Sequence, residues 1–228
     1  CLLKRLFGSM LLISPNFLFA TADFICAEGE NGTTDCQEWV CSTDNEYVWR
    51  SHLPNVPVSL SYEFGWYVCS RQWMVPLVQS MLYFGTVIGY LTVPYFADNF
   101  GRRRAEKVAW AIATLGVFIV STSMSMITVG LGLFLCGMGT NTALNLQYSF
   151  LNELVVGMSK IRMVMWLQLG YSLALGLVAV LALLLQNWRV FAVFFLAFPI
   201  ILLNFGGRWM EETPEFSYAQ SSETLLAS

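Results

Sequence analysis

Val108–Asn152, with the sequence VAWAIATLGVFIVSTSMSMITVGLGLFLCGMGTNTALNLQYSFLN, is the longest part of the chain without an Asp, Glu, Lys, Arg or His. A bilayer core about 30 Å thick needs roughly 20 apolar residues for each spanning helix. The stretch is therefore long enough for two membrane-spanning helices joined by a short turn. The other uncharged runs of the chain are interpreted in the same way, as candidate membrane-spanning helices.

Similar uncharged runs recur on both sides of this stretch, and each is close to the length of one crossing. They are Leu6–Ala22, Gln72–Ala97, Met163–Trp188 and Val190–Gly207. Hydrophobic residues make up 56% of the chain and charged residues 12%, which is outside the usual range of a soluble domain. The fold class predicted is an all-α membrane protein with six transmembrane helices. The alternative is a soluble all-α protein with few charged residues on its surface, but it does not account for the lengths of the uncharged runs.

Basic residues predict the orientation of the spans. Nine of the 12 Lys and Arg residues fall before the first span, between the second and third, between the fourth and fifth, or after the sixth. The positive-inside rule then places both termini in the cytoplasm or its equivalent. The three remaining residues, on the opposite side, are Arg50, Arg71 and Arg189.

The long segment after the first span is expected to face outward. It contains four of the six cysteines, Cys26, Cys36, Cys41 and Cys69. Four thiols in an exposed segment favour two disulfides in an oxidising compartment, with three possible pairings; free thiols are the alternative. Asn31 begins an Asn-Gly-Thr glycosylation sequon in the same segment.

Charged motifs mark the inner loops. Asp98, Gly101, Arg102 and Arg103 follow the second span in the sequence DNFGRRR. Opposite charges at helix ends can pair and hold one arrangement of a bundle, although exposed pairs contribute only about 0 to 1 kcal/mol. The functional interpretation is that these charges form a gating network. The alternative is that the arginines only fix the orientation of the helices in the membrane. The other gating candidates are Glu153 and Arg162, beside the loop between spans four and five, and Glu212, after span six.

These motifs together resemble the organic cation, anion and carnitine transporters of the major facilitator superfamily. The resemblance rests on EFGWYVC (63–69) and PLVQS (76–80), on Asp98-x-x-Gly-Arg-Arg, on Glu153 with Arg162, on Trp188-Arg189, and on ETPEF (212–216). It covers nearly the whole chain. It implies that the chain is the amino-terminal half of a transporter made of two six-helix bundles.

The resemblance also divides the chain. Residues 1–25 are expected to contain the first transmembrane helix, 26–73 the outer cysteine-bearing loop, 74–210 helices two to six, and 211–228 the start of a cytoplasmic linker. Alternating access in this fold comes from rocking one bundle against the other. The expected partners are therefore membrane lipid, a small organic ion, and a missing carboxy-terminal bundle or another membrane subunit.

Polar residues inside the apolar spans predict the walls of a substrate cavity, because such side chains prefer the bundle interior. Asn141, Asn145 and Tyr148 share one face of the fourth span. The substrate-binding candidates are Gln79, Tyr83, Asn145, Tyr148, Gln168 and Tyr171. Packing by interhelical hydrogen bonds is the alternative for each. The small-residue surface of span four, Gly130, Gly132, Gly137, Gly139 and Ala143, is interpreted as helix packing.

Neither catalysis nor nucleic-acid binding is expected. The single histidine, His52, supports no histidine-rich metal site and no nucleophile-base pair, and no cofactor motif is found. Two hypotheses remain: membrane transport of small organic ions, and a degenerate, non-transporting bundle acting as an accessory subunit. The second hypothesis rests on three positions where the family motifs have a basic residue and this chain does not: Asn99, Leu133 and Glu215. The plasma membrane is the expected location, with an organelle membrane as the alternative.

Overall fold

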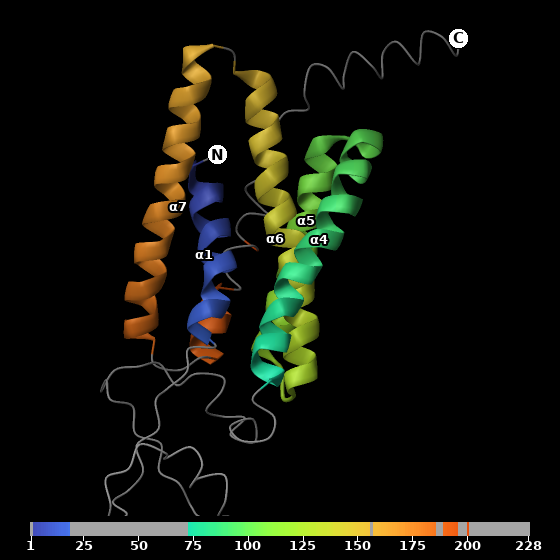
Figure 1. Ribbon diagram of the computed structural model, residues 1–228, viewed down its shortest axis with the longest axis vertical. Helices are drawn as coiled ribbons and strands as arrows, with labels where there is room; N and C mark the ends of the chain where they lie inside the picture. Colours follow the sequence, from blue (N-terminus) through green and yellow to red (C-terminus); the bar gives the residue numbers. More distant parts are fainter. Residues whose placement is uncertain (1, 19–72, 156, 186–188, 196–199, 201–228) are drawn as a thin grey trace, which may run out of the picture.

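The computed structural model describes residues 2–18, 73–155, 157–185, 189–195 and 200, and every regular element in these ranges is helical (Figure 1). The helices are α1 (Leu2–Leu18), α4 (Met74–Phe100), α5 (Arg102–Ser121), α6 (Met126–Leu154) and α7 (Met158–Leu184). Residues 189–195 are also helical. The all-α fold class is confirmed for the described part of the chain.

The predicted spans correspond to these helices with shifted ends. Val108–Asn152 folds as two helices joined by residues 122–125, as expected. Within the residues that the structure describes, three segments are long and apolar enough to cross a membrane: Met74–Phe100, Met126–Asn152 and Ser159–Ala182. The count of six spans remains a prediction. Helix α5, which corresponds to the third predicted span, is described but is not among these three segments. Parts of the first and sixth predicted spans lie outside the described residues.

The turn between α4 and α5 is shorter than predicted. The sequence suggests a loop containing Arg102, Arg103 and Arg104, whereas the structure places all three in the first turn of α5 and leaves Gly101 as the connection. Gly101 has φ 93° and ψ 142°, a conformation that glycine adopts without steric cost. Its backbone N–H donates to the Ala97 carbonyl at 3.0 Å, which closes α4.

Helix α6 is the centre of the bundle, with α4 and α5 packed against it. Its glycines let the backbones approach closely. A Cβ at Gly137 would clash with the Leu82 carbonyl of α4, and one at Gly139 would clash with the Ala109 carbonyl of α5. The predicted packing role of Gly132, Gly137 and Gly139 is confirmed. Gly130 has only ordinary contacts, since a Cβ there would lie no closer than 3.8 Å to a neighbouring side chain.

Helix α1 packs against α6 and α7 and lies between them (Figure 1). Gly8 is tightly packed, because a Cβ there would lie 2.6 Å from Leu144 Cδ2 and 3.0 Å from Trp110 Cη2. Helix α7 leaves many apolar side chains exposed, including Met165 and Trp166 at 67% and 58%. Such a surface is stable in lipid rather than in water.

The chain path gathers most of the described basic residues at one end of the bundle. The α4–α5 turn and the α6–α7 turn both lie at that end (Figure 1). An ion pair between Lys4 and Glu106 brings the beginning of α1 to the beginning of α5. Arg189 follows the opposite end of α7. This arrangement is the one that the positive-inside rule predicts.

Candidate functional site

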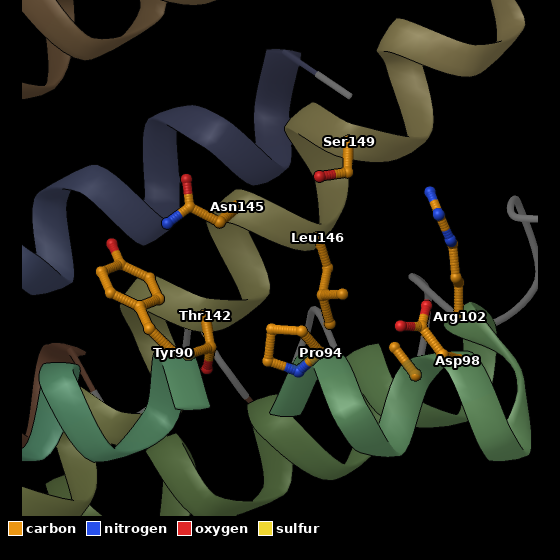
Figure 2. A pocket seen from close by; sticks show the side chains of 9 residues that line it. Tyr90, Pro94, Asp98, Arg102, Thr142, Asn145, Leu146 and Ser149 are labelled. Atoms are coloured by element: carbon orange, nitrogen blue, oxygen red, sulfur yellow. The ribbon is translucent and has the colours of Figure 1, made fainter. Parts of the chain in front are cut away.

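An open hollow of about 100 Å³ lies between α4 and α6, near the basic end of the bundle. Figure 2 shows the side chains that α4, α5 and α6 contribute to it. Most of the exposed lining is apolar, although several of the residues that contribute to it have polar side chains. The lining includes Tyr90, Pro94, Asp98, Arg102, Thr142, Asn145 and Ser149.

Pro94 is one of the residues of α4 that line this hollow. Proline has no backbone N–H and cannot donate to the carbonyl of the residue four positions earlier, which here is Tyr90. The Tyr90 carbonyl therefore receives no helical hydrogen bond from position 94.

A polar contact joins α4 to α1 at the outer end of the bundle, away from the hollow. The Gln79 side chain of α4 donates to Asn16 Oδ1 of α1 at 3.0 Å. Tyr83 and Tyr90 follow Gln79 at helical spacing, so their face of α4 borders the space between α1 and α4. Tyr83 is 59% exposed and Tyr90 is 42% exposed, which leaves both rings open to a ligand.

The predicted substrate residues do not line one described pocket. Asn145 lines the hollow between α4 and α6, whereas Tyr148 lines a much smaller hollow between α6 and α7. Gln79 is half-buried and bonded to Asn16. Gln168 is exposed and Tyr171 is partly buried, packed against the core. Tyr90, Thr142 and Ser149 were missed, although Ser149 is one turn beyond Asn145 and Tyr90 lies two turns beyond Tyr83.

Asn141 has the packing role that was the alternative to a cavity wall. Its side-chain amide donates to Thr86 Oγ1 of α4 at 2.8 Å, and Thr86 donates to the Leu82 carbonyl at 2.9 Å. The two residues therefore join α4 to α6 beside the close contact at Gly137.

The gating candidates are only partly brought together. Asp98 and Arg102 line the same end of the hollow, with Gly101 in the turn between them (Figure 2). Arg103 is partly buried in the first turn of α5, and Arg162 is exposed on α7. Glu153 lies in the last turn of α6, while Glu212 lies outside the described residues.

The ion pair found in the described part of the chain is not predicted by the sequence. Lys4 Nζ and Glu106 Oε1 are 2.9 Å apart, and both side chains are buried. The sequence interpretation treats Lys4 as an orientation signal and overlooks Glu106. A signal is present, since Glu106 is an acid one turn before Trp110 on the buried face of α5.

Several other predictions fall outside the described residues. They concern the disulfide candidates Cys26, Cys36, Cys41 and Cys69 and the glycosylation candidate Asn31. They remain predictions. Cys136 is described, and it is buried in α6 as expected for a small apolar residue.

Comparison with known proteins decides the family. The family described as "Sugar (and other) transporter" matches residues 28–227. The chain belongs to this family. The resemblance to the major facilitator superfamily, based on the loop motifs, is thereby confirmed. An integral membrane transporter family also fits the apolar helices α4, α6 and α7.

Individual relatives are solute carriers of low identity. Solute carrier family 22 member 2 from Rattus norvegicus is 27% identical over 161 residues, covering 70% of this chain and 27% of the relative. Solute carrier family 22 member 1 from Bos taurus is 32% identical over 161 residues, covering 69% and 28%. Solute carrier family 22 member 2 from Homo sapiens is 26% identical over 184 residues, covering 76% and 32%. The matched parts span about a third or less of each relative.

Proposed function

We propose that the chain is the amino-terminal bundle of a facilitator that moves small organic ions across a membrane. The observation that carries this proposal is the hollow between α4 and α6, lined by Tyr90 and Asn145. A face that served only for packing would be closed by apolar side chains, as the α5–α6 contact is at Ala109 and Ala113.

The lining favours an organic ion with an aromatic or amphipathic body. Tyrosine rings attract cations through their π faces, and amides orient a ligand by donating or accepting hydrogen bonds. Asp98 and Arg102 add one charge of each sign at the basic end. The substrate would occupy the space between this bundle and a second bundle or membrane subunit, which would move against it.

The accessory-subunit hypothesis has less support. It rests on departures from the motif, and one of them, Leu133, is buried at 2% exposure in the core. That substitution replaces the basic residue expected by resemblance with a side chain that packs. The relatives are named as solute carriers, which supports the transport hypothesis instead. For the location of the protein we propose the plasma membrane.

Uptake by the protein at its natural length tests the proposal. Tetraethylammonium and benzoate serve as cationic and anionic probes in cells or proteoliposomes. Saturable uptake of either probe is expected. Asn145→Ala is expected to reduce it by about tenfold, since a lost hydrogen bond to a charged ligand costs about 1.5 to 3 kcal/mol.

Thr92→Val is the matched control, because Thr92 is exposed on α4 and donates to the Ile88 carbonyl within its own helix. Its uptake should equal that of the unmodified protein. Absence of saturable uptake of both probes by correctly inserted protein would refute the proposed function. Unchanged uptake by Asn145→Ala would show that the hollow is not part of the substrate path.

A further inference from the structure

A buried ion pair joins α1 to α5 at the basic end of the bundle. Lys4 Nζ lies 2.9 Å from Glu106 Oε1, and the two side chains are 10% and 5% exposed. Separating such a pair leaves each charge in a medium that solvates it poorly, unless another polar group takes its place. The outer end of α1 is held differently, by the exposed hydrogen bond between Gln79 and Asn16.

The packing around Gly8 places this pair within the bundle. Gly8 lies against Leu144 of α6 and Trp110 of α5. One helical turn towards the basic end leads from Gly8 to Lys4 and from Trp110 to Glu106. The ion pair therefore occupies the junction of α1, α5 and α6, one layer beyond Gly8.

Helical geometry assigns Gln147 of α6 to the same junction. It follows Leu144 by three residues towards the basic end of α6, so it occupies the layer of the ion pair. It is 2% exposed, and within the described residues its Oε1 and Nε2 atoms have no hydrogen-bond partner. Buried amides are normally satisfied, because an unmet donor or acceptor costs about as much as a lost hydrogen bond. An unsatisfied amide beside a buried ion pair therefore requires an explanation.

We propose that Lys4, Glu106 and Gln147 form a latch that opens when α1 moves away from α5 during transport. In the closed state the two charges bind each other. In the open state the Gln147 amide donates to the Glu106 carboxylate, so the acid that remains in the bundle keeps a partner, while Lys4 moves away with α1. The role in transport rests on the proposed function, but the motion of α1 can be tested without it.

A cysteine at Leu144 reports this motion directly. Leu144 is 5% exposed and is covered by α1 at Gly8, so Leu144→Cys reacts with a membrane-permeant maleimide only when α1 moves away. Breaking the latch with Glu106→Gln should raise the rate of reaction at least about tenfold. Lys107→Met, which removes an exposed charge on the next residue, is the matched control and should leave the rate unchanged.

Charge reversal separates the ion pair from a local packing defect. Lys4→Glu should increase the labelling rate, and Lys4→Glu combined with Glu106→Lys should return it towards that of the parent. The latch would be overturned if the double variant were labelled as fast as Lys4→Glu. It would also be overturned if Glu106→Gln were labelled at the same rate as the parent. Labelling is measured on the protein at its natural length, in membranes.

Gln147→Leu tests the second half of the proposal. It removes the alternative partner of the Glu106 carboxylate while keeping a side chain of similar size, so the latch should open less often. Labelling of Leu144→Cys should fall by about tenfold, and the maximal rate of uptake should fall with the Michaelis constant unchanged. Unchanged labelling would exclude Gln147 from the latch. If labelling falls but no variant or parent shows uptake, the latch stands and the proposed function fails.

Discussion

Thr86 shows how one side chain can connect two membrane helices. It donates to the Leu82 carbonyl of its own helix and accepts from the Asn141 amide of α6 at 2.8 Å. Thr86→Val keeps the shape and removes both bonds, together with a longer one from Thr86 to the Gly137 carbonyl of α6 at 3.4 Å. The expected loss is about 0.6 to 2 kcal/mol of bundle stability, seen as a lower melting temperature in detergent.

Thr92→Val isolates the interhelical part of this effect. Thr92 makes the same bond within its helix, to the Ile88 carbonyl, but is exposed on α4. Its melting temperature should stay near that of the parent. An equal drop in both variants would mean that the bond from Asn141 contributes nothing to stability.

The sequence identifies Asn141 and Asn145 as polar residues on one face of α6, but their roles depend on neighbours that helical periodicity does not specify. Asn141 meets Thr86, whereas Asn145 lines the hollow. Lys4 and Glu106 are separated by 102 positions, and nothing in either helix alone indicates that they meet. Pairing of distant side chains is decided by the rotation of helices about their axes, which only the packed bundle fixes.

Among the helices, the contact between α4 and α6 depends on glycine. A Cβ at Gly137 would meet the Leu82 backbone, which cannot yield as a flexible side chain would. Gly137→Ala should therefore separate the two helices and cost about 1 to 3 kcal/mol or more, measured as lost folded protein in size-exclusion chromatography.

Gly176→Ala is the corresponding control on α7. A Cβ there would find nothing within 4 Å among the described residues, and alanine favours a helix more than glycine does. This variant should fold as well as the parent. Normal folding of Gly137→Ala would show that the close α4–α6 contact is not needed.

The small-residue pattern of α6 predicts this packing surface from residue types alone, because no other role suits closely spaced glycines in an apolar helix. It does not reveal which neighbour each glycine meets. Gly137 faces α4 and Gly139 faces α5, while Gly130 has room for a side chain. The prediction for the arginines after Gly101 was wrong, since sequence alone does not show that a single glycine suffices for the turn.

For the whole bundle, charge distribution is the most informative property of the sequence. The positive-inside rule assigns the basic residues of α1, α5 and α7 to one surface before any packing is considered, and the helices place them at one end of the bundle (Figure 1). The rule succeeds because the bilayer imposes it on every span at once. The hollow could not be predicted in the same way, since it depends on how α4 and α6 cross.

All of these conclusions require that the helices cross a membrane with their basic turns on the inner side. The sharpest test is labelling of single added cysteines with a membrane-impermeant maleimide in intact cells, with the protein lacking added cysteines as the background. Met124→Cys, in the exposed α5–α6 turn, should react in intact cells, whereas Ser159→Cys, at the start of α7, should react only after permeabilisation. Equal reaction of both positions in intact cells would rule out this topology.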